Sequence, residues 1–218
     1  MNDSSVFDKV AAKRVVAVLV IDDEEQAVPL AEALLAGGVD IMELTLRTKA
    51  AMGALKRIRA SVPEMIAGIG TILTPDQAKA VHDADAAFGV SPGLNERVIE
   101  SARKLGLPFA PGIVTPSDIE RALEFDLQVL KFFPAGPSGG LSYLNAIAAP
   151  YQHLGVRYLP LGGVNQENMG DYLANPHVAA IGGSWIAKRD TIQAGDWATI
   201  TANAKAAMTC ASELRVLS

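Results

Sequence analysis

The chain has 218 residues, of which 50% are hydrophobic and 20% charged, with Gly and Pro spread along its length. This composition excludes a disordered or low-complexity protein and predicts a single domain spanning residues 1–218. The formal net charge of −5 argues against nucleic-acid binding, and the first apolar run is too short to span a bilayer. One cysteine, Cys210, excludes an internal disulfide and fits a reducing cytoplasm.

Eight short apolar runs are predicted to be strands. In chain order they are Val15–Ile21, Ile41–Leu46, Met65–Gly70, Ala86–Val90, Pro108–Pro111, Gln128–Phe133, Arg157–Leu161 and Val178–Ile181. The segments between them have helical periodicity. In Glu24–Leu35 the apolar residues form one stripe, and Gly37 follows its end.

Three strand–helix joints resemble one another. In each, a strand ends at glycine and Thr74, Thr115 or Asn165 is predicted to cap the next helix, with Pro75 and Pro116 at the first helical position. The repeated βα unit predicts an α/β protein of the (β/α)8 TIM barrel class, with a short N-terminal helix before strand one. An open doubly wound sheet is the alternative, although no Gly-x-Gly-x-x-Gly follows the first strand.

Lys131 lies within the apolar run Val129–Pro134. Burial of an ammonium group without a partner is costly. A lysine that gives up its charge in such a place is a nucleophile that can form a Schiff base with a carbonyl compound. The alternative is a lysine on an edge strand whose ammonium group reaches solvent.

Polar and apolar residues alternate along the second predicted strand. Glu43, Thr45 and Arg47 are predicted to share its inward face. Parallel barrel strands are usually apolar throughout, so three inward polar side chains indicate a functional role. A buried Glu43–Arg47 ion pair that serves the fold alone is the alternative.

The last two predicted strands both end in paired glycines. Gly162 and Gly163 follow the seventh strand, and Gly182 and Gly183, with Ser184 after them, follow the eighth. Glycine lets backbone N–H groups approach an anion, and Ser184 adds a hydroxyl donor. TIM barrels commonly bind phosphate at these two places. Two tight turns would give the same pattern.

These motifs resemble the 2-keto-3-deoxy-6-phosphogluconate (KDPG) aldolase family, which includes enzymes that also cleave 4-hydroxy-2-oxoglutarate. The match covers essentially the whole chain and runs through Glu43-Leu-Thr-Leu-Arg47-Thr, Gly68-Ile-Gly-Thr71, Val90-Ser-Pro-Gly93, Pro111-Gly-Ile, Leu130-Lys131-Phe-Phe-Pro-Ala, Gly162-Gly163 and Ile181-Gly-Gly-Ser184-Trp. The resemblance implies a cytoplasmic class I aldolase that needs no metal or other cofactor. It further implies a homotrimer that splits KDPG into pyruvate and glyceraldehyde 3-phosphate in the Entner–Doudoroff pathway.

The resemblance also implies roles for individual residues. Lys131 corresponds to the Schiff-base lysine and Glu43 to the general acid/base. The remaining site residues that it implies are Arg47 and Thr71 for the pyruvyl carboxylate, Pro92 and Phe133 for the pocket walls, and Gly162, Gly163 and Ser184 for the phosphate.

Leu161 departs from the family pattern. Sugar-phosphate members commonly carry a threonine there, whose hydroxyl helps to discriminate the substrate, and leucine cannot donate that hydrogen bond. The same chemistry on 4-hydroxy-2-oxoglutarate or on the galactonate epimer is therefore an alternative. Two alternatives of other classes share the fold: a phosphosugar isomerase or epimerase with Glu43 as proton carrier and Lys131 as a fixed cation, and a non-catalytic sugar-phosphate-binding barrel.

Overall fold

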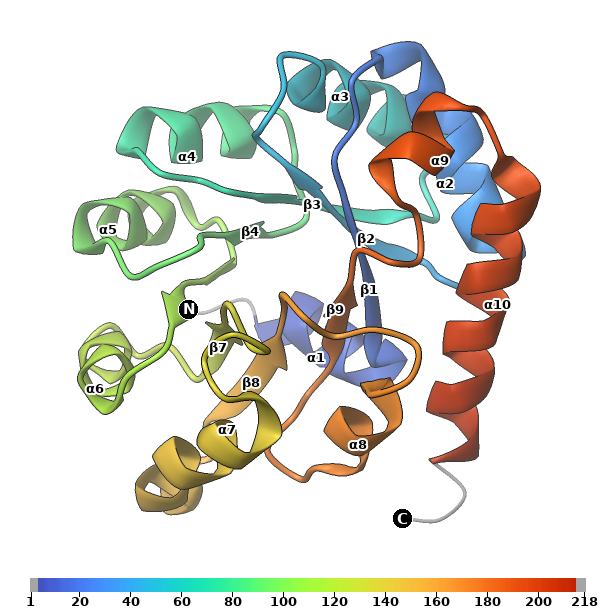
Figure 1. Ribbon diagram of the computed structural model, residues 1–218. Coiled ribbons are helices and arrows are strands. Elements are labelled where there is room, and N and C mark those ends of the chain that lie inside the picture. The colour runs from blue at the N-terminus through green and yellow to red at the C-terminus, as the bar shows by residue number, and fades with distance from the viewer. Residues whose placement is uncertain (1–3, 215–218) are drawn as a thin grey trace.

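The computed structural model describes residues 4–214 as a curled parallel sheet surrounded by helices (Figure 1). The strands are β1 (Val15–Leu19), β2 (Ile41–Thr45), β3 (Ile66–Gly70), β4 (Gly89–Val90), β5 (Phe109–Ala110), β6 (Gly112–Ile113), β7 (Val129–Phe132), β8 (Arg157–Pro160) and β9 (Ile181–Gly183). The predicted α/β class is confirmed, because each predicted strand contains residues of an observed strand.

Helices follow most of the strands and cover the outside of the sheet (Figure 1). The α-helices are α1 (Ser4–Lys13), α2 (Ala27–Ala36), α3 (Ala51–Ser61), α4 (Pro75–Asp83), α5 (Glu96–Leu105), α6 (Pro116–Leu123), α7 (Gly140–Ala148), α8 (Met169–Ala174), α9 (Arg189–Gln193) and α10 (Trp197–Glu213). Two 3-10 helices, η1 (Glu24–Gln26) and η2 (Ala149–Leu154), precede α2 and follow α7. Within residues 4–214, no helix has the length and apolar character needed to cross a membrane.

The strands form two parallel sheets, one with the order β5-β4-β3-β2-β1-β9 and one with the order β6-β7-β8. Isolated bridges join Leu161 to Gly182 and Tyr158 to Val178, next to β8 and β9. Among the described residues the strand pairing is therefore not one continuous eight-stranded ladder. The last strand lies further toward the C-terminus than the predicted range Val178–Ile181. Val178 forms only an isolated bridge, and β9 extends over Gly182 and Gly183.

Two of the three predicted helix caps are confirmed. Thr74 and Thr115 accept hydrogen bonds from backbone N–H groups of α4 and α6, and each forms a capping box. The prediction for Asn165 is wrong, because α8 begins at Met169 with Asn168 at its N-cap. The carboxamide oxygen of Asn165 instead accepts N–H groups of the turn before that helix. Asn closes such turns as readily as it caps helices.

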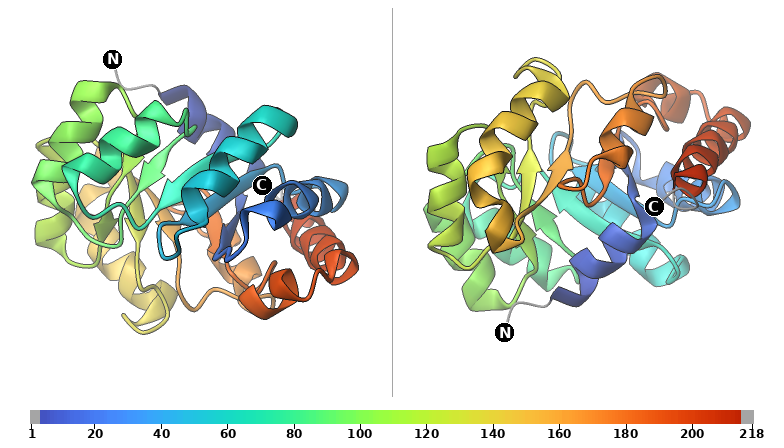
Figure 2. Two further views of the ribbon diagram at one scale, coloured as in Figure 1. Left: turned by 90° about the horizontal axis from the view of Figure 1, so that it is seen from above. Right: turned by 90° about the horizontal axis from the view of Figure 1, so that it is seen from below.

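The predicted N-terminal helix is α1, which lies across the ends of the strands opposite to the points of their arrows (Figure 2). Its apolar side chains join an inner core with side chains from the strands. This core contains Val6, Phe7, Val10, Val16, Ile41, Phe88, Val90, Ala110, Leu159, Leu161 and Ala180. The rings of Phe7 and Phe88 lie 5.9 Å apart. The N-terminal side of the sheet therefore has an apolar floor, and the C-terminal side carries the loops.

Candidate active site

Lys131 on β7 and Glu43 on β2 form an ion pair across the interior of the fold. The distance from Lys131 Nζ to Glu43 Oε1 is 2.9 Å, and the two residues are only 5% and 2% exposed. Because β7 lies between β6 and β8, the alternative of an edge-strand lysine that reaches solvent is wrong. The Glu43–Arg47 ion pair is also wrong, since Glu43 binds Lys131 instead.

The pair has the geometry needed for proton transfer. At hydrogen-bond distance Glu43 can accept a proton from Lys131, which leaves a neutral amine able to attack a carbonyl carbon. The ring of Phe133 lies 5.3 Å from Lys131 Nζ, within the range of a cation–π contact. A buried ion pair of this kind is weak evidence for stability, which favours a chemical role.

Gly70 on β3 provides the space for the Glu43 carboxylate. β3 pairs with β2, and a Cβ atom at position 70 would lie 1.9 Å from Glu43 Oε1. Gly70 is a residue of the site for which the sequence motifs predict no role. The signal was present in the alternating glycines Gly68 and Gly70, on the strand that follows the Glu43 strand.

Arg47 lies outside the strand that carries Glu43. Strand β2 ends at Thr45, and the N–H of Arg47 donates to the carbonyl of Thr45 at 2.7 Å in a tight turn. Glu43 and Thr45 are buried as predicted, whereas Arg47 is exposed. The Thr45 hydroxyl donates to the carbonyl of Leu19 at 2.9 Å, so it joins β2 to β1.

Thr71 and Pro92 lie half-buried just beyond β3 and β4. The φ angle of Thr71 is 63°, which is rare and strained for a β-branched residue. Pro92 packs against Gly112 of β6, where a Cβ atom would lie 2.1 Å from the Pro92 carbonyl oxygen. Both residues therefore lie in loops that follow the C-terminal ends of strands.

The segments that follow β7 and β8 are in contact. Phe133 directly follows β7, and a Cβ atom at Gly162 would lie 3.1 Å from its ring. Gly162 and Gly163 have φ angles of 82° and 94°, in the left-handed region that favours glycine. The N–H of Gly136 donates to the Gly162 carbonyl at 2.7 Å, which fixes this glycine turn.

Leu161 and Ser184 follow β8 and β9. Leu161 is buried against Gly182, where a Cβ atom would lie 2.4 Å from Leu161 Cγ. It lines one interior cavity together with Lys131 and Glu43, and Phe7 and Val10 of α1 line the same cavity. Ser184 is exposed.

The predicted site residues thus lie on β2 and β7 or directly beyond the C-terminal ends of strands. Lys131, Glu43 and Leu161 line the interior cavity, and the ring of Phe133 lies beside Lys131. Within residues 4–214, no hydrogen bond or ion pair links Arg47, Thr71 or Ser184 to the Lys131–Glu43 pair. The buried Lys131–Glu43 pair thus lies inside the fold, and the other predicted site residues lie at the C-terminal ends of the strands.

The family model described as KDPG and KHG aldolase matches residues 6–203 of the chain. The chain belongs to the KDPG and KHG aldolase family. The family resemblance found in the sequence motifs is therefore confirmed. A curated relative, the 2-dehydro-3-deoxy-phosphogluconate aldolase of Treponema pallidum, is 43% identical over 91% of this chain and 93% of the relative. The KHG/KDPG aldolase of Escherichia coli is 44% identical over 89% of this chain and 90% of the relative.

Solved structures of the KDPG and KHG aldolase family have the same fold. The KDPG aldolase of Legionella pneumophila, with pyruvate captured as a covalent carbinolamine intermediate, matches with a TM-score of 0.88. It is 38% identical, over 94% of this chain and 97% of the other. The KDPG aldolase of Zymomonas mobilis with 3-phosphoglycerate matches with a TM-score of 0.86 at 37% identity, over 95% and 96%.

Proposed function

We propose that this family member is a class I aldolase that cleaves KDPG into pyruvate and glyceraldehyde 3-phosphate. The observation that carries the proposal is the buried Lys131–Glu43 pair at 2.9 Å. A buried amine next to a carboxylate suits Schiff-base chemistry. The Legionella relative, in which pyruvate is held as a covalent carbinolamine, supports this choice.

In the proposed reaction, Lys131 attacks the C2 carbonyl of KDPG after giving a proton to Glu43. Glu43 returns this proton to the departing hydroxyl, so the carbinolamine loses water and becomes a protonated imine, which withdraws electrons from the C3–C4 bond. Glu43 takes the proton of the C4 hydroxyl, the bond breaks, and glyceraldehyde 3-phosphate leaves. Protonation of the resulting enamine at C3 and addition of water then release pyruvate and restore the amine.

The other site residues are proposed to bind and orient the substrate. Arg47 and Thr71 would hold the pyruvyl carboxylate, and Pro92 and Phe133 would form the walls of the pocket. At the far end, the phosphate would be bound by the backbone of Gly162 and Gly163 and by the hydroxyl of Ser184. Their positions beyond the C-terminal ends of neighbouring parallel strands support these roles.

We also propose a complete (β/α)8 TIM barrel formed by residues 1–218 as a single domain. The short strands β5 and β6 flank Pro111, a residue without a backbone N–H, and together would count as one barrel strand. The isolated bridges beside β8 and β9 support closure of the ring. The resemblance further supports a cytoplasmic homotrimer. Sedimentation equilibrium tests the trimer, which should have three times the mass of the chain.

Trapping with borohydride tests the proposed function. The protein is incubated with pyruvate and sodium borohydride. The mass of the intact chain is then measured by mass spectrometry, and a digest locates the adduct. We expect a reduced pyruvate adduct on Lys131 and none on Lys131→Ala, which should also have lost KDPG cleavage. Lys79→Ala, which removes an exposed lysine paired with Asp83, is the matched control and should keep both. A wild-type protein without an adduct would instead favour the isomerase or the binding protein.

The same chemistry on the C4 epimer is the second candidate, because Leu161 lines the cavity and offers no hydroxyl. The measurement is kcat/KM for KDPG and for its epimer, in the wild type and in Leu161→Thr. We expect the substitution to shift the ratio toward KDPG. An unchanged ratio would show that Leu161 does not set the stereochemical preference.

A further inference from the structure

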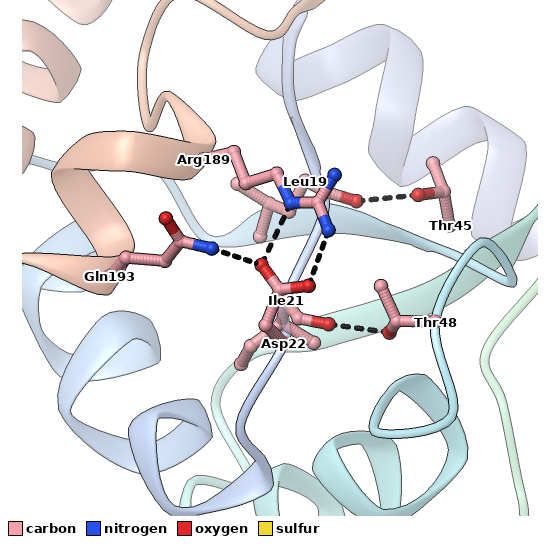
Figure 3. Close-up of polar contacts among 7 residues, drawn as sticks. All are labelled: Leu19, Ile21, Asp22, Thr45, Thr48, Arg189 and Gln193. Carbon is pink, nitrogen blue, oxygen red and sulfur yellow. Dashed lines mark hydrogen bonds and ion pairs between the residues drawn. The ribbon is translucent and has the colours of Figure 1, made fainter.

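The carboxylate of Asp22, just beyond β1, is held by two residues of α9 (Figure 3). Arg189 donates to it through Nε at 2.8 Å and through Nη2 at 2.5 Å. Gln193 donates a third hydrogen bond at 2.7 Å. Arg189 and Gln193 are the first and last residues of α9. One carboxylate therefore holds the whole of this short helix against the end of β1.

The same segment is held from its other side by Thr45, the last residue of β2, and by Thr48, which lies beyond β2 (Figure 3). The hydroxyl of Thr48 donates to the carbonyl of Ile21, the residue before Asp22. The hydroxyl of Thr45 donates to the carbonyl of Leu19. The end of β1 is thus bonded to the segment after β2 and to α9, which are far apart in the sequence.

The segment after β2 and helix α9 each adjoin one end of the proposed substrate site. Thr48 directly follows Arg47, the proposed ligand of the pyruvyl carboxylate. Residues 184–188, which begin with the proposed phosphate ligand Ser184, run from β9 to α9. That loop is also held by Asn203, whose side chain donates to the carbonyls of Trp185 and Ile186. Through its contacts with α9, Asp22 fixes the C-terminal end of residues 184–188.

The contact has features that set it apart from an ordinary surface ion pair. Exposed ion pairs contribute little to stability, but a bidentate arginine adds geometric specificity. The Asp22 side chain is 28% exposed, and the Arg189 hydrogen bond lowers its pKa from the usual range. The carboxylate therefore stays charged throughout the neutral range. Its effect should be on the position of the loop more than on the free energy of unfolding.

We propose that Asp22 and Arg189 are positioning residues that set the separation between the carboxylate-binding and phosphate-binding loops. This inference rests on the proposed function. KDPG carries an anionic group at each end, so its binding needs both loops at the correct separation. Pyruvate has a carboxylate but no phosphate, so its binding depends on the first loop alone.

The test compares Asp22→Ala, Arg189→Ala and the double variant with the wild type. The readouts are KM and kcat for KDPG, and the pyruvate concentration that gives half-maximal borohydride trapping. We expect KM for KDPG to rise about fivefold with kcat unchanged, since binding and not chemistry is lost. The pyruvate concentration that gives half-maximal trapping should not change. The double variant should match Asp22→Ala, because loss of the carboxylate already removes the contact with Arg189. Arg189→Lys should restore part of the loss.

Two further variants sharpen the result. Arg59→Ala, which breaks an exposed ion pair with Asp85 elsewhere on the surface, is the control and should match the wild type. Thr48→Val should raise the half-maximal pyruvate concentration, because it frees the segment that carries Arg47. Equal changes for KDPG and pyruvate in Asp22→Ala, or no change in either, would overturn the proposal.

Amide hydrogen exchange gives a readout that does not depend on activity. Residues 184–188 should exchange faster in Asp22→Ala than in the wild type, and those of Arg59→Ala should not. Unchanged exchange would refute the tether even in an active enzyme. A wild type without a pyruvate adduct would refute the proposed function, and the exchange result would still decide the role of Asp22.

Discussion

The carboxylate of Glu43 contacts the Lys131 ammonium at 2.9 Å, so its removal should affect proton transfer directly. Glu43→Gln keeps the shape of the side chain but cannot accept and return a proton. We expect kcat for KDPG to fall at least ~100-fold, the usual size of a general acid/base effect. Borohydride trapping with pyruvate should still label Lys131. Full turnover in this variant would exclude the acid/base role of Glu43.

Gly70 offers a second test at the level of one residue. In Gly70→Ala the new methyl group would overlap Glu43 Oε1, which lies 1.9 Å from the Cβ position. The carboxylate must then move away from Lys131, and kcat should fall while the protein remains folded by circular dichroism. Gly170→Ala is the matched control, because its Cβ would lie 3.8 Å from Cys210 Sγ, an ordinary contact. Equal kcat in the two variants would contradict the steric argument.

Tyr158 on β8 connects burial to alkaline stability. Its hydroxyl is buried and has no hydrogen-bond partner among residues 4–214, and burial raises its pKa to about 12. In the unfolded chain a tyrosine ionises near pH ~10. The wild type should therefore lose stability as the pH rises from the unfolded to the folded value. Tyr158→Phe lacks this loss, so its advantage in urea unfolding should grow across that interval. A constant difference would argue that the phenol is solvated.

Among the elements, α1 has the clearest structural role. Phe7 is 7% exposed and packs against Phe88 below the Lys131–Glu43 pair. Phe7→Ala should lower the free energy of unfolding by about 3 kcal/mol, the lower end for a buried phenylalanine, as measured by urea titration. Phe7→Leu keeps most of the volume and should lose much less. Similar losses in both variants would show that α1 contributes by something other than filling the interior.

The elements themselves could be predicted well where local signals are strong. Thr74 and Thr115, each followed by Pro, gave correct helix starts because capping is a local interaction. Asn165 misled because its carboxamide can satisfy a turn equally well. The end of β8 and the place of β9 depend on Gly182, whose lack of a side chain makes room for Leu161. Sequence alone does not contain that packing.

At the scale of the whole molecule, the chemistry could be predicted from short sequence motifs. The contacts between residues far apart in the sequence could not, because they depend on the tertiary structure. Lys131 was recognised because a charge in an apolar run is costly. That Glu43 pairs with Lys131 and not with Arg47 follows from the fold, which brings β2 and β7 together although the two residues lie 88 positions apart. Asp22 and Arg189 are separated by 167 positions and belong to no motif, so their contact needed the fold.

The apolar floor formed by α1 has a consequence for the order of events in the proposed reaction. Lys131 lines a cavity that Phe7 and Val10 of α1 close on one side, so substrates and products would share one entrance, on the loop side. Pyruvate stays covalently attached at the bottom while the aldehyde lies nearer the mouth, so the aldehyde leaves first. Pyruvate should then compete with KDPG for the free enzyme, and glyceraldehyde 3-phosphate should give mixed inhibition. The reverse pattern in steady-state product inhibition would contradict this order of release.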